Sequence, residues 1–391
     1  MNEAFDVIVV GAGPAGSSCA RHAAELGLSV TVLEKSTFPR SKPCAGGLTE
    51  RALRLLNGEQ TPVERQRFDT VEIAFGRHLS LLVSGRKMLI ATTTRAEFDA
   101  LLSRAAEAAG AEVEFGRAVT GLEHDGEGVR VRVGSESVTA RHVVVADGAR
   151  GAGRHMLGLT PLLMGGGIYV RVFPATDGLP EPLGGRVLFD LTAAKRGYGW
   201  VFPKGDHVNV GVFSQCELSA RLRRDLDTFV ALRGLGGWRR EGPFAFPIPV
   251  GSPADALGTE RVLFAGDAAG LVNPVTGEGI SSAILSGRLA AEAVSESLDT
   301  GRAVSALYAR RVQAEVVPMT DGSRKKGDRV YSLGPGFLKL VARTPVVKAV
   351  IAHAWRAATR GSEGLSLTVA GRPADGTTGT SVRTRSSTDS T

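Results

Sequence analysis

The sequence predicts an α/β fold, in which a doubly wound parallel sheet is accompanied by an α+β domain built on an antiparallel β-sheet. Three observations lead to this prediction. Residues 5–34 follow the order strand, glycine-rich turn, helix and strand. Residues 69–93 and 165–215 alternate apolar and polar positions, as antiparallel strands do. The length of 391 residues favours two domains over one.

The N-terminal strand–helix–strand unit has the features of a dinucleotide site. A strand, "FDVIVV", is followed at once by "GAGPAG", which opens a helix. Gly11 allows the tight turn, Gly13 lets a pyrophosphate approach the backbone, and Gly16 allows close packing of helix on strand. Glu34 ends the second strand, where a carboxylate can accept a hydrogen bond from a ribose hydroxyl.

The remaining elements follow from the periodicity of apolar residues. An amphipathic helix is predicted over 94–110, and a longer helical segment over 280–298. Residues 303–360 have the pattern of several helices and contain a basic cluster. The predicted strands are 112–121, 128–133 and 137–146, and the basic cluster is Arg324, Lys325, Lys326 and Arg329.

The composition narrows the classes of partner. The net charge of +7 suits an anionic partner, but aromatic and basic residues are not interleaved, so we expect no nucleic-acid binding. Cys19, Cys44 and Cys216 are too far apart for a zinc pair and too few for a four-cysteine cluster, so no metal site is expected. With no signal peptide and no apolar run of about 18 residues, we expect a cytoplasmic protein that could touch a membrane surface.

Two further segments decide the kind of dinucleotide. In "FAGDAAGLVNPVTGEGI", residues 264–280, a strand delivers Asp267 and a loop then enters a helix. This arrangement suits a carboxylate on a ribityl hydroxyl and helix N-terminal amides against a flavin ring oxygen. "VVVADGARGAGR", residues 143–154, ends a strand at Asp147. The three segments together resemble the FAD-binding signatures of the flavoprotein hydroxylase fold of the para-hydroxybenzoate hydroxylase type.

Two more segments resemble a narrower group, the geranylgeranyl reductase family. "FPRSKPCAGGL", residues 38–48, matches its Lys-Pro-Cys-x-Gly-Gly-Leu element. "KRGYGWVFPKG", residues 195–205, matches its P-x-x-Y-x-W-x-F-P pattern, except that Lys195 replaces the first proline. The resemblance covers about residues 5–320.

The resemblance implies a Rossmann-like, discontinuous FAD-binding domain and an antiparallel β-sheet substrate domain, followed by C-terminal helices. The FAD-binding domain would comprise 1–70, 94–160 and 255–320, and the substrate-binding domain 71–93 and 161–254. Residues 321–366 would be helical, and 367–391, rich in Ser, Thr and Gly, a disordered tail. The implied cofactor-binding residues are Gly11, Gly13, Ala15, Gly16, Glu34, Lys35, Cys44, Ala45, Gly46, Arg95, Asp147, Asp267, Gly277, Gly279 and Ile280.

The aromatic residues of the second segment fall on every second position. Tyr198, Trp200 and Phe202 therefore point to one face of a strand. The resemblance implies that they line a substrate pocket over the flavin; a stripe in the core is the alternative. Cys44 lies on a loop that faces the flavin in this family, where it would be a catalytic proton donor or would tune the ring; a buried small hydrophobe is the alternative.

The activity implied is reduction of carbon–carbon double bonds in a prenyl chain by hydride from reduced FAD. NAD(P)H or a ferredoxin would supply the electrons, since no second glycine-rich unit is present. The substrate would be apolar, prenylated and, given the net charge, phosphorylated. The alternatives are an FAD-dependent monooxygenase or oxidase acting on an aromatic or polyketide-type metabolite, and a non-catalytic FAD- or lipid-binding protein. No W-x-W-x-I-P pattern occurs, which argues against a halogenase.

Overall fold

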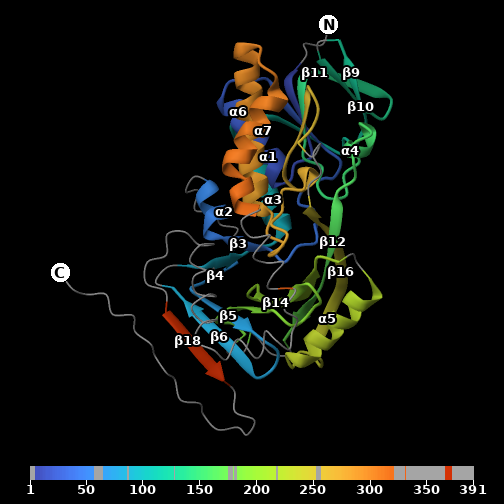
Figure 1. The fold of residues 1–391 in the computed structure, drawn as a ribbon. Helices are drawn as coiled ribbons and strands as arrows, with labels where there is room; N and C mark the ends of the chain where they lie inside the picture. The colour runs from blue at the N-terminus through green and yellow to red at the C-terminus, as the bar shows by residue number, and fades with distance from the viewer. Residues whose placement is uncertain are drawn as a thin grey trace, which may run out of the picture.

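The strands of the protein form three sheets. The computed structural model describes residues 5–56, 65–85, 88–126, 128–174, 179, 183–216, 219–251, 257–320, 331 and 366–371. Within these residues there is a seven-stranded sheet, an eight-stranded sheet and a three-stranded sheet. Figure 1 shows the seven-stranded sheet with its helices at one end of the molecule and the eight-stranded sheet at the other. The predicted α/β fold is confirmed.

The seven-stranded sheet has a parallel centre. β1 (Phe5–Val10) pairs in parallel with β2 (Val30–Glu34) and with β11 (Glu136–Val145). Further parallel pairing adds the outer strands β8 (Glu112–Phe115) and β17 (Val262–Phe264). The first half of β11 pairs antiparallel with β10 (Gly128–Val133), which continues to β9 (Val119–Asp125). Because the central strands are buried on both faces, their sequences are continuous apolar runs.

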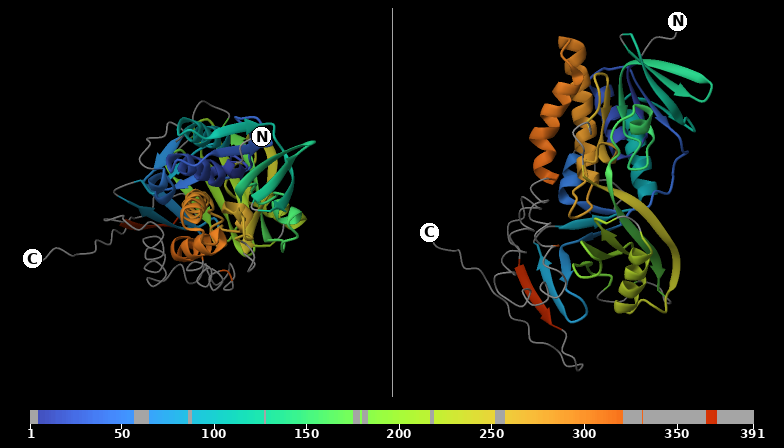
Figure 2. Two further views of the ribbon diagram at one scale, coloured as in Figure 1. Left: turned by 90° about the horizontal axis from the view of Figure 1, so that it is seen from above. Right: turned by 45° about the vertical axis from the view of Figure 1, so that its right-hand side comes forward.

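Four helices accompany this sheet: α1 (Pro14–Glu25), α3 (Arg95–Ala108), α6 (Ile280–Thr300) and α7 (Val304–Glu315). α1 packs against both α3 and α6, and α7 packs against α6 (Figure 2). The helices predicted over 94–110 and 280–298 therefore correspond to α3 and α6. Of the helices expected over 303–360, α7 lies in the described residues, whereas the basic cluster at 324–329 lies outside them.

A small sheet that was not anticipated joins the two halves. It consists of β3 (Gly47–Thr49), β7 (Ile90–Thr92) and β4 (Gln66–Phe68), and α2 (Glu50–Leu55) follows β3 directly. Residues 71–93 are assigned to the substrate-binding domain from the sequence, and β7, near the end of this range, pairs with β3 and β4 in this small sheet. The segment that carries Cys44 enters β3, so this sheet determines where the cysteine lies.

The eight-stranded sheet has one face against a helix and one face lined with rings. α5 (Ala220–Leu232) packs on β12 and β15, where it meets alternate valines of the sheet. The opposite face carries Tyr169, Trp200, Phe202 and Phe213. The strand order is β16 (Arg239–Gly251), β12 (Leu163–Phe173), β15 (Val208–Ser214), β14 (Gly197–Pro203), β13 (Val187–Asp190), β5 (Thr70–Ala74), β6 (Leu79–Ser84) and β18 (Ser366–Gly371).

The sequence predicts a disordered tail from residue 367 onward, but residues 366–371 form the strand β18. β18 pairs antiparallel with β6 from Ser366 opposite Ser84 to Gly371 opposite Leu79. Without β18, the edge of β6 would have unpaired backbone groups. The segment "SLTVAG" contains Thr and Val, which favour strands, whereas the prediction of disorder considered only the high content of Ser, Thr and Gly. The residues after 371 lie outside the described part of the chain.

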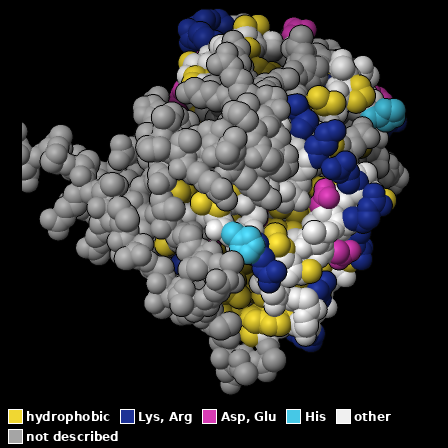
Figure 3. All heavy atoms as spheres, turned by 60° about the horizontal axis from the view of Figure 1, so that its bottom comes forward, with side chains coloured by type: hydrophobic (Ala, Val, Ile, Leu, Met, Phe, Trp, Pro, Cys, Tyr) yellow, Lys and Arg dark blue, Asp and Glu magenta, His cyan; other side chains and the backbone are white. Residues whose placement is uncertain are grey.

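The surface near α5 is rich in arginine. Figure 3 shows a band of Lys and Arg side chains on the face that lies at the bottom of Figure 1, with a few acidic side chains among them. Arg221 and Arg223 on α5 and Arg239 on β16 all have more than half of their side chain exposed. Among the described residues, no helix is long and apolar enough to cross a bilayer.

Candidate active site

The glycine loop between β1 and α1 is shaped by contacts that leave no room for side chains. Gly11 has a φ of +97°, and a Cβ there would lie 2.8 Å from the Ala146 carbonyl oxygen. A Cβ on Gly16 would lie 1.8 Å from the Gly11 oxygen. Gly13, the N-cap of α1, is open by contrast, and this N-terminus has no side-chain cap. The first-turn amides of α1 are therefore available to an anion.

Two guanidinium groups flank this opening. A Cβ on Gly13 would meet nothing closer than a terminal nitrogen of Arg40 at 3.8 Å and one of Arg95 at 4.0 Å. Arg95 donates two hydrogen bonds to Asp99, at 2.7 and 2.8 Å, and Arg40 lies 3.1 Å from the same carboxylate. Burial opposes the Arg95 charge, but the Asp99 carboxylate raises the pKa of Arg95. Arg40 also lies 3.6 Å from Glu34, so the carboxylates of Glu34 and Asp99 hold the two guanidinium groups beside the opening, where their N–H groups suit a diphosphate.

Sequence reasoning missed Arg40 and Asp99, although signals for both were present. Arg40 lies inside the "FPRSKPCAGGL" segment, and Asp99 is one helical turn after Arg95. Glu34, which was predicted, is only 4% exposed. Its carboxylate accepts hydrogen bonds from the backbone of Ala12 at 2.8 Å and of Ser36 at 3.0 Å, and so fixes the glycine loop to the end of β2. Two further predicted residues differ in exposure: Ala15 is buried and Lys35 is exposed.

The 264–280 segment lies on the other side of the glycine loop. Asp267, in the short helix η1 (Gly266–Ala269), is 3.7 Å from the ammonium group of Lys42. α6 begins at Ile280 after the N-cap Gly279, and the Glu278 carboxylate accepts a hydrogen bond from the Ser281 backbone at 2.8 Å in its first turn. Gly277 has a φ of +65°. The segment therefore presents the Asp267 carboxylate beside a helix N-terminus that Glu278 caps.

Asp147 has a local role in the structure. Its Oδ2 accepts a hydrogen bond from the backbone of Gly153 at 2.9 Å, at the start of α4 (Gly153–Met156). A Cβ on Gly151 would lie 1.9 Å from the Asp147 carboxyl carbon. Burial raises the pKa of Asp147. These contacts close the loop after β11, and the predicted contact of Asp147 with FAD stays a prediction.

The Cys44 loop is held by contacts on both sides. The backbone of Gly46 donates to the Cys44 sulfur at 3.3 Å, and Asn209 donates to the Cys44 carbonyl at 3.3 Å. Gly46 has a φ of +68°, and a Cβ there would lie 2.2 Å from the Thr93 oxygen. Ala45 packs against the ring-lined face of the eight-stranded sheet. The thiol thus lies between the glycine-loop region and the ring-lined face, half-buried.

The aromatic residues of β14 have polar contacts as well as packed rings. The Trp200 indole, 2% exposed, donates to Asn209 Oδ1 at 2.8 Å, so it orients the amide that binds Cys44. The Tyr198 hydroxyl donates to the carbonyl of Thr276, in the loop before α6. Phe202 packs edge-on to Phe189. β14 therefore connects the Cys44 loop and the 264–280 segment; that its rings line a substrate pocket remains a prediction.

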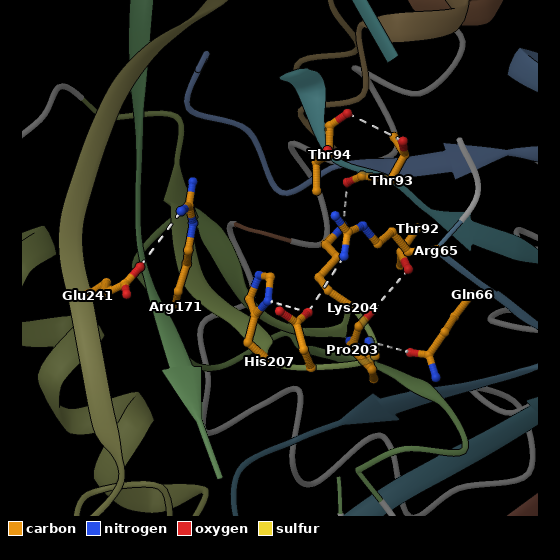
Figure 4. Close-up of polar contacts among 12 residues, drawn as sticks. Arg65, Gln66, Thr92, Thr93, Thr94, Arg171, Pro203, Lys204, His207 and Glu241 are labelled. Atoms are coloured by element: carbon orange, nitrogen blue, oxygen red, sulfur yellow. Dashed lines mark hydrogen bonds and ion pairs between the residues drawn. The ribbon is translucent and has the colours of Figure 1, made fainter. Parts of the chain in front are cut away.

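Sequence reasoning also missed Lys204, which is 3% exposed. Its ammonium group donates to the carbonyls of Gly46 and Thr93, both at 2.9 Å. Burial lowers the pKa of Lys204 from 10.5 to about 7. Figure 4 shows Lys204 beside Thr93, with Arg65 and His207 close by. Its position two residues after Phe202, in the quoted aromatic segment, was the available signal.

The residues present fit FAD. The open position at Gly13 with two guanidinium groups suits the diphosphate, and the buried Glu34 has carboxylate lone pairs left for a ribose hydroxyl. The Asp267 carboxylate suits a hydroxyl of the ribityl chain.

Comparisons with known proteins agree with this fit. A family model described as FAD binding domain matches residues 4–225. A menaquinone reductase of Mycobacterium tuberculosis is 33% identical over 80% of this chain and 81% of its own. A digeranylgeranylglycerophospholipid reductase of Methanopyrus kandleri is 32% identical over 79% of this chain and 85% of its own.

Solved structures show the same fold. A geranylgeranyl bacteriochlorophyll reductase-like protein of Thermoplasma acidophilum has a TM-score of 0.78 at 24% identity, covering 91% of this chain and 96% of its own. The flavin-dependent brominase Bmp2 has a TM-score of 0.70 at 19% identity, covering 92% and 96%. At these identities the likeness shows the fold alone, and flavoproteins of different chemistry share it.

Proposed function

The chain belongs to the geranylgeranyl reductase family of FAD-dependent oxidoreductases, and on that premise we propose that it reduces carbon–carbon double bonds in the prenyl chain of a lipid. Relatives are named for a menaquinone, a digeranylgeranylglycerophospholipid and a geranylgeranyl diphosphate. The last two names share a prenyl chain, and we infer that the substrate of this protein also carries one.

One observation supports the proposal most: a thiol is held against a ring-lined face. Tyr169, Trp200, Phe202 and Phe213 form one apolar cluster, and Ala45 packs on it next to Cys44. The four rings are 1–4% exposed and form a core, so the apolar and aromatic surface that suits a prenyl chain is at its border, where the partly buried Tyr198, Phe244 and Phe246 pack. The faces of the rings also favour positive charge that develops on an alkene as it takes up a proton.

In the proposed reaction the protein provides the proton. An isolated alkene is not polarised by a carbonyl group, so its protonation is the difficult step. The Cys44 thiol, half-buried and held by Gly46 and Asn209, would donate the proton from Sγ. The packed rings would exclude water that competes for it. FAD, when bound in its reduced form, supplies the hydride.

The head group and the electron donor belong to the same proposal. The net charge of +7 and the exposed arginines of α5 favour an anionic head group or an anionic membrane that contains the substrate. NAD(P)H or a ferredoxin would reduce the flavin. Adding each donor anaerobically and following the loss of flavin absorbance distinguishes between them.

The test is mass spectrometry of the products. The purified protein is reduced without oxygen and incubated with geranylgeranyl diphosphate, with menaquinone and with a lipid extract, and the reactions are repeated in air with NADPH. Gains of about 2 Da per double bond without oxygen, found on fragments of the prenyl chain because reduction of the quinone ring of menaquinone also adds about 2 Da, support the proposal. Gains of about 16 Da that occur only in air would assign a monooxygenase instead. If the protein binds FAD but converts none of these substrates, the result would assign a non-catalytic FAD- or lipid-binding protein instead.

A further inference from the structure

Lys42 is a cation of the candidate active site to which the proposed reaction assigns no role. Its ammonium group lies 3.7 Å from Asp267 Oδ2, and 34% of its side chain is exposed. A hydrogen bond from an ammonium group to a carboxylate is shorter, about 2.7–2.9 Å. The two groups therefore form an ion pair without a hydrogen bond, and the pair leaves the N–H donors of Lys42 available to a ligand.

The segment that carries Lys42 runs along the cofactor site. Arg40 lies at the opening of the glycine loop, and Ala45 packs on the ring-lined face. Between them, Lys42 lies beside Asp267 and is 3.5 Å from the position that a Cβ on Gly148 would take. The flavin ring of FAD must lie between the diphosphate and the substrate, because it passes a hydride to the substrate. Lys42 is thus at the part of the site that suits the flavin end of FAD.

The other charged groups of this region are held more closely by their partners. Asp99 lies 2.7 Å from Arg95 and 3.1 Å from Arg40. Asp147, which precedes Gly148, accepts a hydrogen bond from a backbone amide at 2.9 Å. The long contact of Lys42 with Asp267 leaves its ammonium group the most able of these cations to respond to a change of charge on a ligand.

Reduction of the cofactor is such a change of charge. A hydride consists of two electrons and one proton, so a neutral ring that has accepted a hydride carries one negative charge. Two electrons from a ferredoxin and one proton from water lead to the same charge. A cation that is already in place beside the ring stabilises the charged form relative to the neutral form.

We propose that Lys42 binds FAD at its flavin end and stabilises the negative charge of the reduced ring, while Asp267 holds the ammonium group in position. Lys42 would thereby raise the reduction potential of the bound cofactor, so that the electron donor reduces it more readily. This inference rests on FAD binding and on hydride transfer, and it is independent of which substrate accepts the hydride.

The experiment measures the midpoint potential of FAD in the FAD-loaded protein, without oxygen and against a reference dye. Dissociation of oxidised FAD on dilution is followed in parallel by the rise of flavin fluorescence. Lys42→Met removes the charge, and Lys42→Arg keeps it. Lys195→Met is the control, because it removes an exposed lysine just before β14. No prenyl substrate is present, so a failure of this inference is distinguishable from a failure of the proposed function.

We expect Lys42→Met to lose about tenfold of the preference for reduced over oxidised FAD, which lowers the midpoint potential by about 30 mV for this two-electron couple. Lys42→Arg and Lys195→Met should stay close to the potential of the parent protein. If Lys42 binds the diphosphate instead, both forms of FAD lose the same affinity. FAD would then dissociate more readily at an unchanged potential, and this result would overturn the proposal.

A second measurement keeps the test decisive if Lys42→Met does not retain FAD. The midpoint potential of the parent protein and of Lys42→Arg is then measured between pH 6 and 8. A fall of about 30 mV per pH unit means that one proton accompanies two electrons, so the reduced ring is negatively charged, as we expect. A fall of about twice that size means that two protons are taken up. The reduced ring would then be neutral and would offer Lys42 no charge to stabilise, which refutes the proposal.

Discussion

At the residue scale, Trp200 and Asn209 link a buried ring to the cysteine loop. Trp200→Phe keeps an aromatic ring, although a smaller one, and leaves Asn209 Oδ1 without its donor, at a cost of about 1–3 kcal/mol in the free energy of unfolding for the lost hydrogen bond. Trp200→Ala would leave a larger cavity and lower the free energy of unfolding by about 3–5 kcal/mol, so it would not isolate the effect of the hydrogen bond to Asn209. We expect Trp200→Phe to retain FAD, to lose turnover and to expose Cys44 to faster alkylation.

Urea unfolding, flavin absorbance and the alkylation rate measure these three effects. Trp238→Phe is the matched control, because Trp238 is half-buried beside the α5 face and far from Cys44. If Trp200→Phe behaves as Trp238→Phe does, the indole hydrogen bond does not orient Asn209.

Lys204 also predicts how stability depends on pH. Its pKa is about 7 in the folded protein and about 10.4 in an unfolded chain, so the unfolded chain binds more protons between these values. The free energy of unfolding therefore rises from pH 7 to pH 10 on account of this residue, by the order of a few kcal/mol. Lys204→Met should lose this rise, and Lys195→Met should keep it. Urea unfolding at pH 7 and pH 9.5 measures the slope, and equal slopes in both variants would contradict the assignment.

Lys204 and Asn209, two of the residues that sequence reasoning missed, share one property. Lys204 contacts Gly46, 158 positions away, and Asn209 contacts Cys44, 165 positions away. Cys44, Tyr198 and Trp200 were singled out because they stand in recognisable segments. A contact between two segments becomes visible only when the small sheet brings them together, so the partners of Cys44 could not be derived from either segment alone.

At the scale of elements, the crossing of α1 and α6 supports the glycine loop. A Cβ on Gly287, in α6, would lie 2.0 Å from the backbone oxygen of Ala15 in α1. Gly287→Ala should push the helices apart, lower the free energy of unfolding by about 1–3 kcal/mol and weaken FAD binding. Gly237→Ala is the control, because a Cβ there meets nothing within 4 Å. Thermal unfolding and flavin titration measure the difference, and a Gly287→Ala protein as stable as the control would show that the crossing is not tight.

A second prediction at this scale concerns β18. A chain that ends after residue 365 lacks β18 and leaves the edge of β6 unpaired, and exposed strand edges associate with one another. We expect this chain to aggregate on heating sooner than a chain that ends after residue 371, which keeps the strand and loses only the residues beyond it. Light scattering during a temperature ramp measures this, and coincident curves would show that β18 does not protect the edge.

At the scale of the whole molecule, α5, which carries exposed arginines, lies at the opposite end from β10 (Figure 1). If α5 faces an anionic membrane, Arg221→Glu with Arg223→Glu should reduce sedimentation with phosphatidylglycerol vesicles in 0.1 M salt several-fold, since the Debye length there is about 10 Å. Arg130→Glu with Arg132→Glu makes the same change in net charge on β10, where both side chains are about half exposed. Equal losses in the two double variants would show that net charge alone, and not this face, governs the association.

The architecture was predictable where it depends on local pattern. The strand–glycine–helix order around Gly11 and the alternation in 165–215 each specify an element without knowledge of its partners. The three-stranded sheet was missed because β3, β4 and β7 are three residues each and carry no pattern of their own. The pairing of β18 was missed because it depends on a free edge that belongs to strands near the other end of the chain.

The distance in sequence between β6 and β18 has a consequence for biosynthesis. A ribosome makes β6 long before β18, and at about 5–20 residues per second the interval is of the order of tens of seconds. Throughout that time the edge of β6 is open to other nascent chains on the same message. Any event that halts translation between the two strands would release a protein with an unpaired strand edge, so quality control of this chain depends on residues 366–371 being synthesised.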